Sequence, residues 1–178
     1  NMVVLMAGGF GKRMMPYTET SPKPMLEVAG KPLLQHLIER ARADGFRHFV
    51  ITLHYLPQVI RDHFGDGSRF DVQIDYVTEG TPLGTAGALS LLPARPDLPF
   101  VVANGDILTE VRFSDMLEFH RAHGATATMA VREHEYHNPF GVVQTDGMLI
   151  TGFEEKPVWR TRINGGIYVL SPQALDHL

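Results

Sequence analysis

A glycine-rich loop with two adjacent cations follows the first apolar segment of the chain. Its sequence, AGGFGKR, places Gly8, Gly9 and Gly11 directly before Lys12 and Arg13. Glycine lets a backbone approach a bound anion closely and turn its N–H groups toward it, and the two side chains add positive charge. We therefore predict an anion-binding loop, with a tight surface loop beside solvated cations as the plain alternative.

The spacing of this loop does not match either of two common nucleotide-binding motifs. A P-loop has Ser or Thr after its Gly-Lys pair, whereas Arg13 follows Lys12 here and Met6 stands at the position of the first P-loop glycine. A dinucleotide fingerprint has a third glycine where this chain has Met14. Neither motif accounts for the loop.

Two further segments carry charges at positions suited to a phosphate site. Lys23 lies between Pro22 and Pro24 in SPKP, where the fixed φ angle of proline stiffens the backbone. Asp106 ends the apolar run PFVVANGD, which is typical of a strand end. Its carboxylate could cap the next segment or bind Mg²⁺, an ion that prefers oxygen ligands.

The elements that would position these residues alternate between strands and helices. Apolar runs that end at glycines predict strands, and apolar residues at helical spacing predict helices. The alternation indicates a Rossmann-like α/β fold, with a mostly parallel sheet flanked by helices, and Asp146-Gly147 predicts a late antiparallel hairpin. The expected strands span residues 3–7, 48–53, 71–77, 99–106, 125–131 and 163–170; the expected helices span residues 33–44, 59–64, 84–92 and 114–123, with Ser114 as an N-cap, and another begins at Ser171.

Composition limits the class of protein. The chain has 178 residues, enough for one core and too few for two full domains, and no apolar run approaches the roughly 20 residues of a membrane helix. It has no cysteine and a net charge of −4, which excludes disulfides and argues against non-specific nucleic-acid binding. The pairs His120/His123 and His134/His137 lack the further ligands of a zinc site, so we expect no metal there.

The motifs occur in the order found in sugar-1-phosphate nucleotidylyltransferases (nucleoside-diphosphate-sugar pyrophosphorylases), and the chain resembles that family. The family signature is L-A-G-G-x-G-T-R-L-x-P-L-T-x-x-x-P-K-P-[ML]-[LV]-x-[VI]-x-G-K-P. The chain matches most of it from Leu5 to Pro32, with Lys12 in place of Thr. The segments PLGTAGAL, NGDIL, PFGVV, FEEKP and INGGIYVL also match in order. The residues of these segments are most similar to those of mannose-1-phosphate guanylyltransferases and glucose-1-phosphate relatives.

The resemblance implies transfer of a nucleotidyl group from a nucleoside triphosphate to a sugar-1-phosphate, with Mg²⁺ as cofactor and release of pyrophosphate. It implies that Arg13 and Lys23 are catalytic and that Asp106 binds the metal. We expect Arg13 and Lys23 to form one wall of the site and Asp106 and Lys156 the opposite wall, with Trp159 on a short loop beside the sugar. The implied nucleotide-binding residues are Ala7, Gly8, Gly9, Gly11, Lys12, Glu79, Gly84 and Thr85, and the implied sugar-phosphate-binding residues are Gly141, Glu155, Lys156 and Asn164.

The resemblance also concerns the extent of the chain. The family has a second metal-binding Asp on a strand beyond GIYVL, so we expect residues 1–178 to be a nucleotidyltransferase catalytic domain truncated at its C-terminus, with half of its metal site. An N-terminal truncation, a regulatory domain outside this segment and a homo-oligomer are left open, and the family implies a cytoplasmic protein. Two alternatives remain: a non-catalytic domain that binds nucleotide-sugars, and an enzyme that acts on a non-sugar phosphate.

Overall fold

A computed structural model describes the chain except for residues 12, 13 and 82 and the side chain of Thr85. The described chain divides into two compact units. Unit 1 comprises Asn1–Met129 and Gly166–Leu178, and unit 2 comprises Ala130–Gly165. Among the described residues, no helix is both long enough and apolar enough to cross a membrane.

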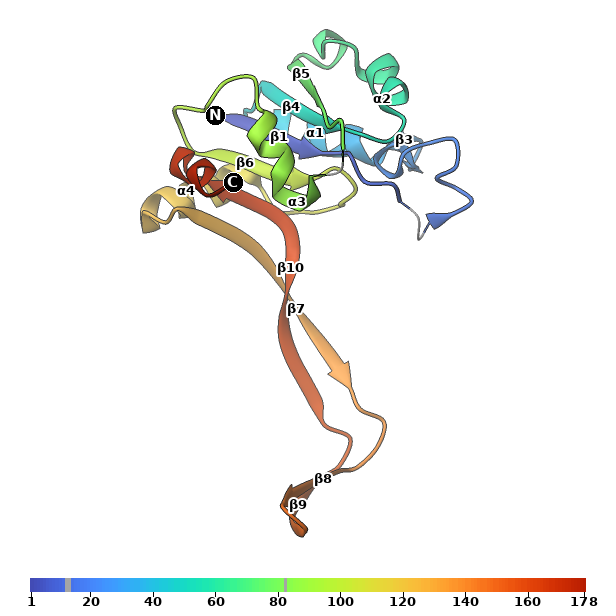
Figure 1. The fold of residues 1–178 in the computed structure, drawn as a ribbon, viewed down its shortest axis with the longest axis vertical. Helices are drawn as coiled ribbons and strands as arrows, with labels where there is room; N and C mark the ends of the chain where they lie inside the picture. The colour runs from blue at the N-terminus through green and yellow to red at the C-terminus, as the bar shows by residue number, and fades with distance from the viewer. Residues whose placement is uncertain (12–13, 82) are drawn as a thin grey trace. The chain divides into compact units, whose positions relative to one another are not determined.

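A mostly parallel sheet forms the centre of unit 1 (Figure 1). Its parallel strands are β1 (Met2–Met6), β4 (His48–Leu53), β5 (Gln73–Thr78) and β6 (Phe100–Asn104), which pair in the order β5-β4-β1-β6. β10 (Val158–Leu170) pairs antiparallel with β6, and β7 (Ala127–His137) follows it in the sheet. Both β7 and β10 continue from unit 1 into unit 2. The predicted α/β fold is confirmed.

The core of unit 1 lies on both faces of this sheet, as is usual for parallel strands. On one face, Val4, Val50 and Val102 form a buried cluster with Leu89. Side chains alternate between the faces along a strand, so the neighbouring residues belong to the opposite face. These residues are also completely buried: Val3, Leu5, Phe49, Ile51, Val101 and Ala103.

Helices and short segments connect the strands of unit 1. The predicted helix over residues 84–92 is one short α-helix that continues as a 3-10 helix. The α-helices are α1 (Leu33–Ala43), α2 (Pro57–Phe64), α3 (Gly84–Gly87) and α4 (Phe113–His123). The remaining elements are the 3-10 helices η2 (Lys23–Met25), η3 (Ser68–Phe70), η4 (Ala88–Leu91) and η5 (Pro172–His177) and the paired strands β2 (Glu27–Val28) and β3 (Lys31–Pro32).

The prediction that Ser114 caps its helix is wrong, because a distant residue provides the cap. α4 begins at Phe113, whose backbone N–H donates to Asp44 Oδ2 at 2.8 Å. Asp44 follows α1 directly, so the cap depends on how the two helices meet in space. Ser114 bonds instead to the neighbouring Asp115 carboxylate.

Unit 2 contains the predicted antiparallel hairpin. Its strands β8 (Val142–Asp146) and β9 (Leu149–Glu154) pair antiparallel on either side of the turn at Gly147. The expected loop around Trp159 is wrong, because β10 already begins at Val158. Arg160 of β10 donates from Nε to Glu135 Oε1 of β7 at 2.8 Å, and such cross-strand pairs favour a strand where the sequence has no apolar alternation.

Candidate functional site

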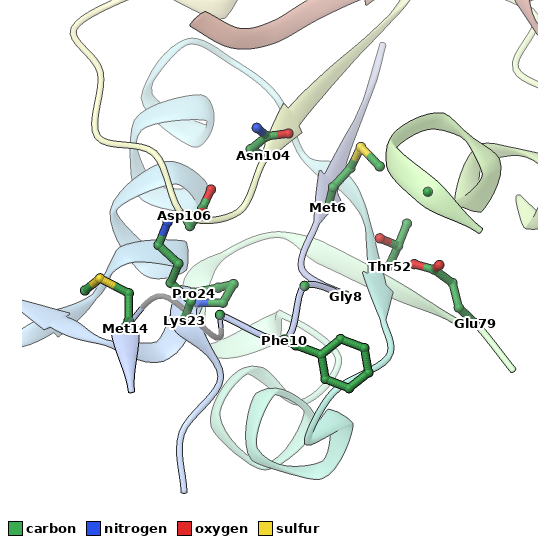
Figure 2. A pocket seen from close by; sticks show the side chains of 13 residues that line it. Met6, Gly8, Phe10, Met14, Lys23, Pro24, Thr52, Glu79, Asn104 and Asp106 are labelled. Carbon is green, nitrogen blue, oxygen red and sulfur yellow. Dashed lines mark ion pairs between the residues drawn. The ribbon is translucent and has the colours of Figure 1, made fainter. Parts of the chain in front are cut away.

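A cavity of about 530 Å³ lies at the carboxyl ends of the parallel strands of unit 1. Strand register places Met6 beside Thr52 on β4 and beside Asn104 on β6, and Glu79 directly follows β5. Figure 2 shows these side chains around the cavity. Parallel α/β sheets bind ligands at this edge, and the volume is typical of small-molecule sites.

The glycine loop lines the cavity, and packing explains two of its glycines. A Cβ at Gly8 would lie 2.7 Å from Glu79 Oε1 and 3.3 Å from His54 Cβ. Gly11 has a φ of +62°, and its carbonyl accepts a hydrogen bond from Thr18 Oγ1 at 3.0 Å. A Cβ at Gly9 would meet no described atom within 4 Å. Among the described residues, none therefore restricts the size of the side chain at Gly9.

Aromatic contacts attach the glycine loop to the segment after β4. The ring of Phe10 meets that of His54 edge-on, with centroids 5.1 Å apart, and lies 5.5 Å from that of Tyr55. The Tyr55 hydroxyl reaches the carbonyl oxygens of Thr18 and Glu19, both at 3.1 Å. The loop and the segment that follows it are thus held at two places.

Lys23 and Asp106 meet at one end of the cavity. Lys23 Nζ lies 2.6 Å from Asp106 Oδ2, and the two side chains are 35% and 29% exposed. Lys23 begins η2 after Pro22, whose φ is −65°, and Asp106 follows β6 after Gly105, whose backbone N–H donates to Met6 O at 2.9 Å. The two residues were expected on opposite walls, but the structure brings them into direct contact.

Glu79 marks the other end of the cavity in Figure 2. The residue is buried, with 8% exposed, and its Oε2 accepts the Leu83 N–H at 3.0 Å. The Glu79 carbonyl accepts a hydrogen bond from His54 Nδ1 at 3.0 Å. Among the described residues, Leu83 is the one hydrogen-bond partner of this carboxylate. The carboxylate thus has unused acceptor capacity beside the cavity.

The structure describes the other expected nucleotide-binding residues to different extents. Ala7 is buried, and its N–H donates to Thr52 O at 3.0 Å, so this N–H is already used by the sheet edge. Gly84 lines the cavity and begins α3 with a φ of +79°. Lys12 and Arg13 lie outside the described residues, as does the side chain of Thr85.

The expected sugar-phosphate residues belong to unit 2. A Cβ at Gly141 would lie 3.1 Å from Glu155 Oε2, and Lys156 Nζ lies 3.9 Å from Glu155 Oε1. Lys156 has a φ of +46°, and Asn164 is an exposed residue of β10. The structure therefore brings Gly141, Glu155 and Lys156 together within unit 2.

Three residues at the strand ends were missed by sequence reasoning. Met6, Thr52 and Asn104 line the cavity. Thr52 and Asn104 are polar residues near the ends of predicted apolar strands, and this pattern could have identified them. Gly166 keeps space for one of them, because a Cβ there would lie 2.8 Å from Asn104 Nδ2. The sequence predicted the strands but not which side chains of neighbouring strands adjoin.

The residues around Asp106 fit a magnesium ion that is held mainly by substrate. Among the described residues, no group of at least three His, Cys, Asp or Glu side chains could hold a metal. Mg²⁺ is commonly held by one or two carboxylates together with phosphate oxygens and water. Asp106 can be such a carboxylate once its ion pair with Lys23 is broken.

The chain belongs to the nucleotidyl transferase family, whose model matches residues 2–178. Mannose-1-phosphate guanyltransferase of Schizosaccharomyces pombe is 39% identical over 184 residues, which cover 98% of this chain and 51% of that protein. Mannose-1-phosphate guanylyltransferase 1 of Arabidopsis thaliana is 36% identical over 186 residues, which cover 98% of this chain and 51% of that protein. The chain spans about half the length of the curated relatives it matches.

Solved structures share the fold. HddC from Yersinia pseudotuberculosis in complex with GMP-PN has a TM-score of 0.72 and 26% identity, with 99% of this chain and 79% of that chain aligned. A UDP-glucose pyrophosphorylase in complex with UDP-glucose has a TM-score of 0.71 and 22% identity, with 99% of this chain and 78% of that chain aligned. The family resemblance derived from the sequence motifs is confirmed.

Proposed function

We propose that the protein transfers a nucleotidyl group from a nucleoside triphosphate to a sugar-1-phosphate and releases pyrophosphate. The observation that carries the proposal is the strand-end cavity, which has the Lys23–Asp106 pair at one end and the Glu79 carboxylate at the other. Cationic and metal-binding groups suit phosphates, and a buried acceptor suits the polar edge of a base. Family membership supports the same reaction.

The reaction needs positioning and charge neutralisation more than proton transfer. A phosphate monoester has a second pKa of about 6, so the attacking oxygen is already anionic at neutral pH. This oxygen forms a bond to the α-phosphorus, and the bond from that phosphorus to the α–β bridging oxygen breaks, so that pyrophosphate leaves with the electron pair. We assign Lys23 to the α-phosphate and Arg13 to the departing phosphates, where a guanidinium can contact several oxygens.

The metal completes the neutralisation of charge. Asp106 would hold the ion, and bound Mg²⁺ would offset the negative charge of the phosphates as they react. Lys23, freed from Asp106, would then donate to a phosphate oxygen. Both roles use side chains that already lie at one end of the cavity.

For the nucleotide, we propose guanosine triphosphate. Guanine presents neighbouring N1–H and N2–H donors, which match the unused acceptor capacity of the buried Glu79 carboxylate. The relatives named mannose-1-phosphate guanyltransferase support this choice. By the same names we propose mannose-1-phosphate as the sugar substrate, with Gly141, Glu155, Lys156 and Asn164 as its binding residues. A cytoplasmic location and a homo-oligomer stay predictions.

The proposal is tested by a panel of pyrophosphate-release assays with Mg²⁺. GTP, ATP, UTP, CTP and dTTP are each combined with mannose-1-phosphate or glucose-1-phosphate, and each substrate is also supplied alone. We expect release only when both substrates are present, with the highest rate for GTP and mannose-1-phosphate. Absence of release across the panel, with retained binding of a nucleotide-sugar, would instead identify a binding domain.

A further inference from the structure

Thr52 combines complete burial with an unused hydroxyl. The residue is 0% exposed, and within the described part of the chain its Oγ1 has no hydrogen-bond partner. Burial of a hydroxyl without a partner destabilises a folded protein, and valine would fill nearly the same volume without that cost. Thr52 also lines the strand-end cavity, so the cavity is the place to look for its role.

The sheet places Thr52 on the same face as Glu79. Thr52 is paired in register with Val77 of β5, and side chains two residues apart along a strand point to the same side. Glu79 follows Val77 by two residues and continues the pairing, because its N–H donates to Leu53 O at 2.8 Å. Figure 2 shows Thr52 and Glu79 at the same end of the cavity, away from Lys23 and Asp106.

The Glu79 carboxylate lacks the donors that a buried charge needs. A carboxylate can accept about four hydrogen bonds, whereas among the described residues Glu79 receives one, from Leu83. No described cation forms an ion pair with it, because the Lys, Arg and His ion pairs of the structure involve other acids. The Thr52 O–H is an unused donor on the same face of the sheet.

We propose that Thr52 is a positioning residue for Glu79 and thereby determines base selection. When a base enters the cavity, the Glu79 carboxylate accepts the Thr52 O–H in addition to the Leu83 N–H. With the carboxylate fixed in this way, its remaining acceptor sites face the N–H donors of the base. Guanine, with its neighbouring N1–H and N2–H donors, matches these acceptor sites best. Thr52 itself stays buried and does not touch the base. This inference rests on the proposed function, in which Glu79 contacts the nucleobase.

The test compares Thr52→Val and Thr52→Ser with the wild-type protein. Isothermal titration calorimetry measures binding of GTP and of inorganic tripolyphosphate, which has phosphates but no base. For Thr52→Val we expect about three- to tenfold weaker binding of GTP, the loss of one hydrogen bond, with unchanged binding of tripolyphosphate. Thr52→Ser keeps the hydroxyl and should bind GTP as the wild type does. Without ligand, Thr52→Val should unfold at the same or a higher temperature.

A double-mutant cycle identifies the group through which Thr52 acts. In a Glu79→Ala background, Thr52→Val should cause a much smaller loss of GTP affinity, because the acceptor that the Thr52 hydroxyl orients is absent. An equal loss in both backgrounds would show that the hydroxyl acts without Glu79 and would overturn the proposal. Should Thr52→Val fail to fold, Thr52→Ala provides the same comparison.

The remaining outcomes separate this inference from the proposed function. Equal GTP affinity of Thr52→Val and the wild type would overturn the positioning role and leave the proposed function intact. An equal loss for GTP and tripolyphosphate would show a general change of the cavity and also overturn it. If the wild-type protein binds no nucleoside triphosphate, the proposed function fails and the inference fails with it.

Discussion

Lys23 and Asp106 form a 2.6 Å ion pair at one end of the strand-end cavity. Each residue is thus the other's counterion before any ligand arrives. In the proposed reaction, an incoming triphosphate would compete with Asp106 for Lys23, and a metal ion would compete with Lys23 for Asp106. Because one exchange releases the partner needed for the other, binding of nucleotide and metal should be coupled.

This coupling predicts opposite effects of Asp106→Asn with and without metal. In the presence of EDTA, the substitution should strengthen GTP binding about two- to fivefold, because Lys23 is released and a negative charge near the phosphates is removed. With Mg²⁺, the same substitution should weaken GTP binding, because the metal loses its carboxylate. Calorimetric titrations under both conditions measure the two affinities.

A matched control is available in unit 1. Glu39→Gln breaks another lysine–carboxylate pair, in which Lys31 Nζ lies 2.8 Å from Glu39 Oε2, and neither residue lines the cavity. This variant should bind GTP as the wild type does in EDTA and in Mg²⁺. If Asp106→Asn changed the GTP affinity in the same direction in EDTA and in Mg²⁺, the proposed exchange of ion-pair partners would be wrong.

Two glycines of the glycine loop should respond differently to alanine. In Gly8→Ala the new Cβ would lie 2.7 Å from Glu79 Oε1 and 3.3 Å from His54 Cβ, and the Glu79 carboxylate is held by the Leu83 N–H. We therefore expect a loss of about 1–3 kcal/mol in the free energy of unfolding, as in other overpacked sites, and weaker GTP binding. Gly9→Ala should change the free energy of unfolding by less than about 0.5 kcal/mol, since its Cβ meets no described atom within 4 Å. Urea denaturation compares the variants, and equal losses would show that Gly8 is not restricted by Glu79.

Arg13 is expected to act on the reaction and not on folding. Arg13→Ala should lower the rate of pyrophosphate release by about 100-fold or more, because it removes the cation that the proposed function assigns to the departing phosphates. Its thermal unfolding midpoint should equal that of the wild type. A wild-type rate in this variant would remove Arg13 from the mechanism.

The cap of α4 allows a direct comparison between sequence and structure. Asp44→Ala removes the acceptor of the Phe113 N–H and should lower the free energy of unfolding by about 1 kcal/mol, as expected for the loss of a helix cap. Ser114→Ala should change it by less than about 0.5 kcal/mol, because the Ser114 hydroxyl bonds only to Asp115 among the described residues. A larger loss of unfolding free energy in Ser114→Ala than in Asp44→Ala would instead support Ser114 as the cap, as the sequence predicts.

Buried His120 should make the stability of unit 1 depend on pH. Its Nδ1 and Nε2 each lie 2.9 Å from a hydroxyl oxygen, of Thr128 and Ser171. Since the Ser171 hydroxyl also reaches Ala125 O at 3.1 Å, a neutral ring that donates from Nε2 and accepts at Nδ1 satisfies every group. Burial, and to a smaller extent the charge of Arg121, lowers the pKa of His120 below 6.5.

The sign of the pH effect follows from this lowered pKa. Well above pH 6.5 the ring is neutral in both the folded and the unfolded chain and has no effect on the free energy of unfolding. As the pH falls below 6.5, the unfolded chain takes up the proton first, so the free energy of unfolding decreases until the folded pKa is reached. Urea denaturation between pH 8 and pH 5 should show this decrease, and His120→Gln should reduce it. The same pH dependence in the wild type and in His120→Gln would show that His120 does not cause the decrease.

Much of the fold could be predicted from patterns within single segments. The alternation of apolar runs with helical spacing indicated the parallel sheet, and Asp146-Gly147 indicated the hairpin formed by β8 and β9. The lengths of β7 and β10 were underestimated, because the outer parts of both strands are polar. These parts are paired through contacts such as that of Arg160 with Glu135. Such pairing depends on the partner strand and has no signature within either segment.

The sequence by itself determined the family, the glycine loop and the charged residues Lys23, Asp106 and Glu79, because fixed residues at fixed spacing carry that information. The tertiary structure alone decided which of them touch. Strand register places Thr52 beside Met6, the start of η2 approaches the segment after β6 so that Lys23 pairs with Asp106, and Gly8 packs on Glu79. These contacts join residues far apart in the chain, and only the folded sheet brings the ends of its strands to one cavity.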